Sequence, residues 1–158
     1  MIFSIITLLL VISDQMSKLA VLKYIKPLGS VKVIENIFSL TYVENRGAAF
    51  GILQNARWVF LVMTTIILIV LIYYKVKYKP ESKIMNISLC LLISGAVGNM
   101  IDRVFRGFVV DMIEVTFINY PVFNVADCFV VIGAILLMIY IMFIYKEPQK
   151  RDDENDRI

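Results

Sequence analysis

The stretch NVADCFVVIGAILLMIYIMFIY (residues 124–145) decides the fold, because it is an apolar run with a single charge near its start. That charge is Asp127, and no other charged residue occurs between Cys128 and Tyr145. A helix needs about 20 apolar residues to cross the hydrocarbon core of a bilayer, with a lower limit of about 17. The run therefore predicts a transmembrane helix. A carboxylate at the end of such a helix is energetically unfavourable in lipid, so it marks a candidate functional position.

Three further runs of the same kind occur in a chain of 158 residues, 59% of them hydrophobic. Its mean hydropathy of +0.79 is typical of a membrane protein and not of a soluble domain. The first run has no basic leading segment and no small-residue cleavage site, so we expect a spanning helix rather than a removable signal peptide. The sequence predicts an all-α membrane protein with four transmembrane helices, forming a single integral membrane domain over residues 1–158. The expected spans are 1–22, 57–75, 84–103 and 124–145.

Basic residues predict the orientation of these helices in the membrane. The short loop KVKYKPESK (75–83) is the most basic of the connections, and cytoplasmic loops carry an excess of lysine and arginine. We therefore expect this loop, both termini and a tail over 146–158 to be cytoplasmic. Loops 23–56 and 104–123 are then extracytoplasmic.

The first of these outer loops has strand-like patterning. VKVI (31–34) and IFSLTYV (37–43) alternate apolar and polar residues as a strand pair does. AAFGIL (48–53) and the residues up to Trp58 suggest a short interfacial helix. IEVTFI (113–118), in the other outer loop, is a third strand-like segment. We expect a small extracytoplasmic β platform.

The intramembrane polar residues are predicted to gather at one membrane surface. Alternating helix directions bring the end of the first span, the end of the third and the start of the fourth to the same side. Within each span the polar residues are three or four positions apart and share a helix face. The residues concerned are Asp14 and Lys18, then Asn99, Asp102 and Arg103, then Asn124 and Asp127, with Asp111 in the adjoining loop.

Two interpretations of these charges remain open for part of the set. Asp14 with Lys18, and Asp102 with Arg103, fit structural ion pairs as well as functional groups. Asp111 and Asp127 have no obvious cation within a helical turn, and Arg106 is the nearest candidate for Asp111, so a functional role is favoured for these two. Asn45 fits an ordinary turn residue as well as a ligand.

The residue types restrict the chemistry that the site can perform. The chain has no histidine, which excludes Ser-His-Asp and Cys-His catalysis, and two carboxylates with amides are too few for a metal cage. Two neighbouring carboxylates can instead share a proton, one acting as a base toward water and the other as an acid. Asp127 begins a helix, where the dipole favours an anion, so we expect it to be the ionised partner. A net charge of +3 without a basic stripe argues against nucleic-acid binding.

Five motifs resemble, in order and spacing, those of the lipoprotein signal peptidase (signal peptidase II) family. They cover nearly the whole chain and are DQMSK (14–18), ENRGAAF (44–50), GNMIDR (98–103), VVD (109–111) and FNVAD (123–127). The resemblance implies a bacterial membrane aspartic endopeptidase without a cofactor. Such an enzyme cuts a prolipoprotein before a cysteine that carries diacylglycerol, works near the outer face of the cell membrane, and is inhibited by the cyclic peptide globomycin.

The same resemblance implies roles for individual residues. Asp111 and Asp127 correspond to the catalytic pair. The other residues of the motifs are implied to bind substrate or to support the pair, and they are Asp14, Lys18, Asn45, Gly47, Asn99, Asp102, Arg103, Asn124 and Ala126.

A transport or binding protein with a polar outer-leaflet site is the alternative. A transport path needs polar groups through the whole membrane depth. The inner halves of the last three spans carry almost none, with Asn86 and Ser88 as the exceptions. This distribution favours the enzyme.

Overall fold

A computed structural model describes residues 2–47 and 52–145. The expected tail over 146–158 and the first part of the expected interfacial helix lie outside the described residues, and Ile52–Asn55 form turns. The four expected apolar helices are present, each long enough to cross a membrane. They are α1 (Ile2–Ala20), which continues as the π-helix η1 (Val21–Ile25), α2 (Arg57–Tyr78), α3 (Lys83–Phe105) and α4 (Val125–Ile139), which continues as the π-helix η3 (Tyr140–Ile144).

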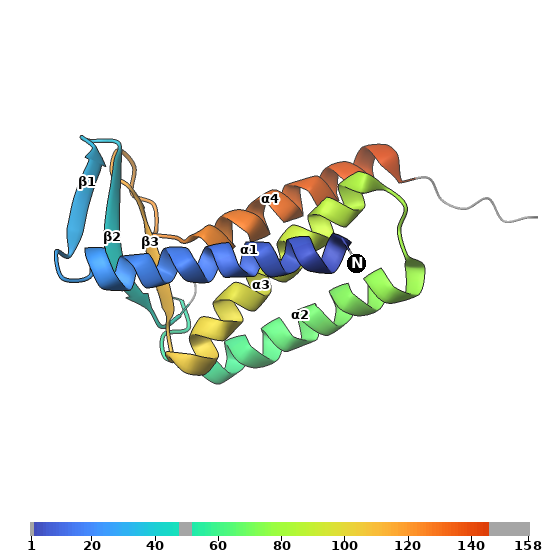
Figure 1. Ribbon diagram of the computed structural model, residues 1–158, viewed down its shortest axis with the longest axis horizontal. Coiled ribbons are helices and arrows are strands. Elements are labelled where there is room, and N and C mark those ends of the chain that lie inside the picture. Colours follow the sequence, from blue (N-terminus) through green and yellow to red (C-terminus); the bar gives the residue numbers. More distant parts are fainter. Residues whose placement is uncertain (1, 48–51, 146–158) are drawn as a thin grey trace, which may run out of the picture.

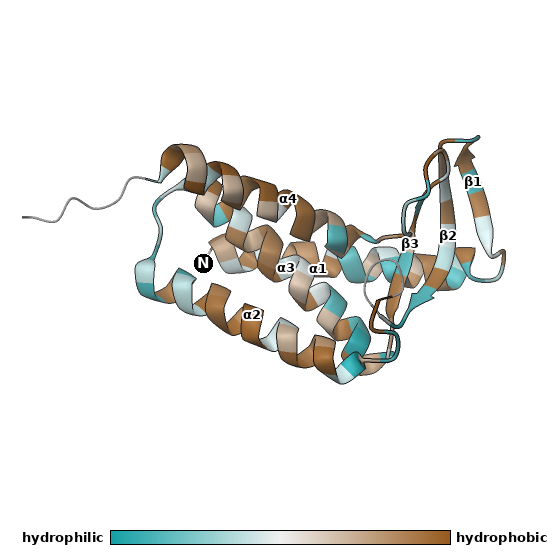
Figure 2. Ribbon diagram, turned by 180° about the vertical axis from the view of Figure 1, so that it is seen from behind, coloured by the Kyte–Doolittle hydropathy of each residue, from teal (hydrophilic) through white to brown (hydrophobic). Residues whose placement is uncertain are grey.

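The surface of the helices identifies a multi-pass membrane protein. Large apolar side chains point outward along all four, and α2 buries no residue at all. Figure 2 shows this apolar surface along the bundle and polar colours at its two ends. A helix that is apolar on all sides is stable only in a large core or in lipid. A chain of this size has no such core, so lipid must cover these surfaces.

Helix α3 occupies the centre of the bundle and packs against each of the other three helices. Glycines make its contact with α4 close. A Cβ atom added at Gly95 would lie 2.4 Å from the carbonyl oxygen of Ala126, and one added at Gly133 would lie 2.9 Å from Cγ of Leu92. Small residues at these positions therefore allow the two helix backbones to approach each other.

A three-stranded antiparallel sheet covers one end of the bundle, across the direction of the helices (Figure 1). Its strands lie in the order β1 (Ser30–Ile34), β2 (Phe38–Asn45) and β3 (Val109–Val115). The expected β platform is thus present. The third strand begins earlier than the predicted segment 113–118, so that Asp111 lies within the sheet and not in a loop.

Packing against the end of α1 explains why the strand begins at Val109. Val110 and Met112 are buried on Val21 of η1, and these three residues form a hydrophobic core beneath the sheet. In a strand, alternate residues face opposite sides. Asp111, between the two buried residues, therefore faces away from that core and toward the start of α4.

Candidate active site

The two acids with the strongest expectation of function come from different elements at the sheet end of the bundle. Asp111 lies in the middle of β3, and Asp127 lies in the first turn of α4. Asp111 is 1% exposed, whereas Asp127 is only partly buried. The site therefore has an enclosed acid and a more accessible one.

The Asp111 carboxylate accepts hydrogen bonds from two side-chain amides. Nδ2 of Asn124 donates to Oδ1 at 2.7 Å, and Nδ2 of Asn45 donates to Oδ2 at 2.9 Å. The sheet register explains the second contact. Val43 pairs with Asp111 and Asn45 pairs with Val109, so Asn45 and Asp111 are diagonal neighbours on one face of the sheet.

Helix α4 begins with a capping box that involves the second acid. Oδ1 of Asn124 accepts the backbone N–H of Asp127 at 2.9 Å, and Oδ2 of Asp127 accepts the backbone N–H of Asn124 at 3.1 Å. This arrangement satisfies two N–H groups that a helix start leaves without partners. It also fixes the Asp127 side chain against the helix start.

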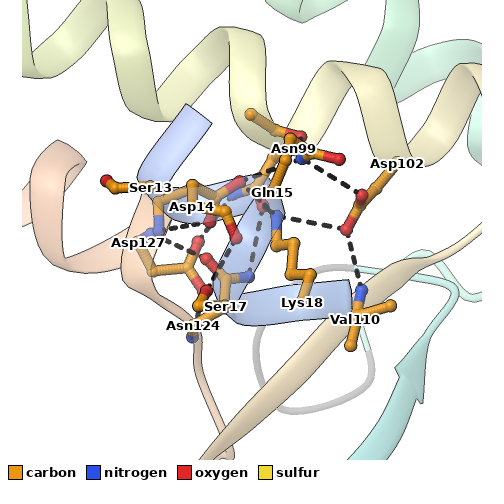
Figure 3. Close-up of polar contacts among 12 residues, drawn as sticks. Ser13, Asp14, Gln15, Ser17, Lys18, Asn99, Asp102, Val110, Asn124 and Asp127 are labelled. Carbon is orange, nitrogen blue, oxygen red and sulfur yellow. Dashed lines mark hydrogen bonds and ion pairs between the residues drawn. The ribbon is translucent and has the colours of Figure 1, made fainter. Parts of the chain in front are cut away.

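Asn99 of α3 connects the surroundings of the two acids, and Figure 3 shows Asn99 with Asn124 and Asp127. Its Nδ2 donates to Oδ1 of Asp127 at 2.8 Å, and its Oδ1 accepts from Nδ2 of Asn124 at 3.1 Å. Asn124 in turn is bonded to Asp111. A continuous chain of amides therefore runs from one carboxylate to the other.

Burial and the neighbouring acid act on the protonation of Asp111. Desolvation first, and the negative charge of Asp127 second, raise the pKa of Asp111 to about 6, although the hydrogen bonds from Asn124 and Asn45 lower it. A carboxyl group with a pKa near neutrality exchanges a proton readily at physiological pH. This property suits an acid–base pair.

Lys18 pairs with Asp14, as one interpretation expected, and also with Asp102. The distances from its Nζ are 2.9 Å to Oδ2 of Asp14 and 3.1 Å to Oδ2 of Asp102. The same ammonium donates to Oδ1 of Asn99 at 3.0 Å. The fully buried Ala126 joins this group through its backbone N–H, which donates to Oδ1 of Asp14 at 3.0 Å.

The ion pair of Asp102 with Arg103, which one of the two interpretations allowed, does not form among the residues that the structure describes. Asp102 pairs with Arg106, one helical turn later, so Arg106 is not the partner of Asp111 that the sequence suggested. Arg103 points elsewhere: its guanidinium lies 4.7 Å from the Phe60 ring centroid and donates to the carbonyl oxygen of Gly47 at 3.3 Å. Arg106 pairs with Asp102 because a residue at i+4 lies on the same face of a helix, whereas a residue at i+1, such as Arg103, points in a different direction.

Gly47 completes a turn that follows β2. Its backbone N–H donates to Oδ1 of Asn45 at 2.9 Å, while Nδ2 of Asn45 bonds Asp111. The turn and ligand interpretations of Asn45 therefore both describe real contacts. Added to Gly47, a Cβ atom would lie 2.6 Å from the carbonyl oxygen of Ile52, so the turn requires glycine.

Gln15 is a site residue that the sequence reasoning missed. Its Nε2 donates to Oδ2 of Asp14 and to the carbonyl oxygen of Gly98, each at 3.1 Å, and its Oε1 accepts from Arg106 at 3.2 Å. The available signal was its position beside Asp14, in a span whose only charged residues are Asp14 and Lys18.

An apolar cavity of about 450 Å³ adjoins the more accessible acid. Asp127 lines it, together with Cys128 and Val131 of α4 and aromatic residues that follow β3, Phe117 and Phe123. A second cavity of about 500 Å³ lies between α1, α2 and α3 near Lys75 and contains no acid. Of these two cavities, only the one of about 450 Å³ would hold an apolar group of a bound substrate beside a carboxylate.

Comparison with known proteins identifies the family of this chain. The sequence model of the family described as signal peptidase (SPase) II matches residues 6–143. The lipoprotein signal peptidase of Caldanaerobacter subterraneus subsp. tengcongensis is 49% identical over 140 residues, which are 88% of this chain and 94% of that protein. The lipoprotein signal peptidase of Clostridioides difficile is 43% identical over 143 residues, which are 90% and 96% of the two chains.

Solved structures show the same fold. One structure of a bacterial membrane enzyme, obtained by the in meso method, superposes with a TM-score of 0.81 at 35% identity and covers 94% of both chains. A second has a TM-score of 0.81 at 36% identity and covers 90% of this chain and 94% of the other. The fold and these relatives define a multi-pass membrane peptidase of the aspartic class.

Within that class, the chain belongs to the signal peptidase II family. Its activity is the removal of signal peptides from prolipoproteins. The alternative of a transport or binding protein is thereby set aside.

Proposed function

We propose that Asp111 and Asp127 are the catalytic dyad of this peptidase. The observation that carries the proposal is the amide chain through Asn124 and Asn99, which joins a carboxylate on the sheet to one on the last helix. Such a chain orients both acids at once, and oriented acid–base groups are what peptide hydrolysis without a metal or a nucleophile requires.

The two acids take different protonation states. Asp111 holds the shared proton, because it is almost fully enclosed and its pKa is raised to about 6. Asp127 is the ionised partner, because it lies in the first turn of α4 and accepts a backbone N–H there. The proton belongs to the pair as a whole during a titration.

Hydrolysis then follows in two steps. Asp127 takes a proton from a water as the water oxygen bonds to the scissile carbonyl carbon, while Asp111 gives its proton to the carbonyl oxygen. The C–N bond of the tetrahedral intermediate breaks as Asp127 passes its proton to the amine nitrogen, and a hydroxyl of the intermediate returns a proton to Asp111. The products are a signal peptide with a new carboxyl end and a lipoprotein with a free amino group on its first residue.

The substrate that best fits the site carries lipid next to the cut. A signal peptide is apolar and lies within the bilayer, and a diacylglyceryl group on the cysteine after the scissile bond remains there too. The cavity beside Asp127 offers an apolar surface at the same depth as the dyad. Cleavage therefore proceeds without moving the lipid into water, and globomycin-type inhibitors occupy the same place.

The polar end of the bundle faces the outer side of the membrane. The basic connection from α2 to α3, with Lys75, Lys77, Lys79 and Lys83, lies at the other end and is cytoplasmic (Figure 1). Both termini are then cytoplasmic, and water reaches the dyad from outside.

The turn at Asn45 and Gly47, held by Arg103, positions the substrate backbone beside Asp111.

A cleavage assay with purified protein in detergent and a lipid-modified prolipoprotein tests the dyad. Asp111→Asn and Asp127→Asn preserve the shape of the side chain and one of the two hydrogen bonds that each acid accepts, but they remove the acid, so each is expected to lower kcat by at least about 10⁴-fold. Thr7→Val, on α1 far from the dyad, is the control for general packing. Wild-type turnover in either Asn variant would show that the assignment is wrong.

A further inference from the structure

Lys18 is a buried cation with partners on two helices. The side chains of Lys18, Asp14 and Asp102 are all 0% exposed. The ammonium contacts both carboxylates and, as its third partner, the Asn99 amide oxygen. A lysine ammonium has three donors, and here each has an acceptor.

Each of the two carboxylates makes a further contact with the protein backbone. Oδ1 of Asp14 accepts the N–H of Ala126 at 3.0 Å, and Oδ2 of Asp102 accepts the N–H of Val110 at 3.0 Å. Ala126 directly precedes Asp127, and Val110 directly precedes Asp111. Both backbone donors belong to residues with 0% exposure, so water cannot replace the carboxylates there.

We propose that Lys18 is a positioning residue that sets the relative placement of the two catalytic acids. It holds Asp14 and Asp102 together, and each of these carboxylates fixes the backbone immediately before one acid of the dyad. The last helix and the third strand are thereby tied to one ammonium group. This inference rests on the dyad proposed above.

A simple ion pair between helices does not require this arrangement. Lys18 with Asp14 alone would stabilise α1, and Lys18 with Asp102 alone would join α1 to α3. The additional bonds to Ala126 and Val110 extend the cluster to α4 and β3. Figure 3 shows the bond between Asp102 and Val110. These two are the elements that carry the dyad.

Lys18 also acts on the dyad through its charge. It is among the groups that lower the pKa of Asp111, against the larger effects of burial and of Asp127. The other charged groups facing the cluster are Asp14 on α1, Asp102, Arg103 and Arg106 on α3, Asp127 on α4 and Asp111 on β3. Removal of the Lys18 charge therefore raises the pKa of Asp111.

The first test is Lys18→Met, which keeps an unbranched side chain one atom shorter and removes the ammonium. We expect kcat to fall by about 100-fold with little change in KM, since small misplacements of reacting groups have effects of this size. The alkaline limb of the pH profile is expected to move to higher pH, because activity requires a protonated Asp111. Thr7→Val, on the α1 face toward Cys90, is the matched control and leaves the profile in place. A loss of kcat with an unshifted profile would overturn the proposal.

The second test compares Asp14→Asn with Asp14→Leu, two side chains of nearly equal size. The asparagine oxygen still accepts the Ala126 N–H, whereas leucine does not. Amide hydrogen exchange over residues 124–130, followed by mass spectrometry, is expected to remain slow in Asp14→Asn and to accelerate in Asp14→Leu. Activity is expected to fall in the same order. Equal exchange and equal activity in the two variants would refute the proposal, even if Lys18→Met does not fold.

The exchange experiment also separates this inference from the dyad assignment. Faster exchange in Asp14→Leu depends only on the hydrogen bond from the Ala126 N–H to Asp14. Should Asp111→Asn keep its turnover, the dyad would be wrong while the exchange result still described how Asp14 holds α4.

Discussion

The side-chain amide of Asn124 donates to the Asp111 carboxylate at 2.7 Å, and the same residue caps the helix that carries Asp127. One side chain thus has a structural task and a functional one. Its oxygen stabilises the start of α4, and its nitrogen orients an acid on the sheet. Two substitutions separate the tasks.

Asn124→Ala is expected to remove both the cap of α4 and the hydrogen bond to Asp111. Loss of a helix cap lowers the free energy of unfolding by about 1 kcal/mol, and loss of the donor leaves Asp111 misaligned. Asn124→Ser restores a cap, because serine accepts the Asp127 N–H, but it does not reach Asp111. We therefore expect thermal unfolding of the serine variant close to wild type and kcat lower by about 10²-fold. Full activity in Asn124→Ser would show that the bond to Asp111 has no role.

The stability of the protein is expected to depend on pH through Asp111. Its pKa is about 6 in the folded protein and about 3.9 in an unfolded chain. The folded state therefore binds the proton more tightly, and this contribution is complete below the unfolded pKa and lost as pH rises through 6. The loss is on the order of 3 kcal/mol at most. Thermal unfolding in detergent at pH 5 and pH 7.5 measures the part of this loss that occurs above pH 5, and Asp111→Asn is expected to reduce the difference. An equal difference in that variant would assign the effect to other groups.

Asn45→Leu is expected to shift the pH profile of cleavage. The amide of Asn45 stabilises the ionised form of Asp111 and so lowers its pKa. Without this donor the pKa of Asp111 rises, and the alkaline limb of the profile moves to higher pH. The measurement is kcat across a pH series. A shift to lower pH would contradict the arrangement in which Asp111 is the protonated acid.

Gly98→Ala is expected to disturb Asp14. The added Cβ would lie 2.5 Å from Oδ2 of Asp14 and 3.3 Å from Cβ of Ala126. Overpacking of this kind destabilises by roughly 1–3 kcal/mol. The same substitution made in an Asp14→Ala background is expected to cost much less, because the clashing carboxylate is gone. Additive effects of the two changes in a double-mutant cycle of unfolding would indicate that the clash is relieved elsewhere.

The sequence was sufficient to predict the four helices, the strand pair and the convergence of the polar residues, because these depend on run length and helix periodicity. It also indicated the pair of Lys18 with Asp14, which are four positions apart on one helix. The resemblance to the family then added the candidate roles of the motif residues.

The pairing of Asp102 with Lys18 and the start of β3 were not predictable from local patterns. The i+4 spacing alone favours Arg106 over Arg103 as a partner of Asp102, while Arg103 contacts Gly47 and Phe60, which arrive from distant segments. Strand β3 begins at Val109 because η1 offers a surface for Val110, and that contact spans much of the chain. The hydrogen bonds of Asp14 and Asp102 to the backbone could not be predicted from the residue types, because every residue except proline has the N–H group that they use.

The capped start of α4 determines when the active site can assemble during synthesis. During synthesis, α4 is the last of the four helices to leave the ribosome, and Asn124 and Asp127 arrive with it. Before that moment Asp111 lacks the amide of Asn124, and Asp14 lacks the backbone N–H of Ala126. The nascent chain therefore does not cleave signal peptides, and proteolytic activity arises only when insertion into the membrane is complete.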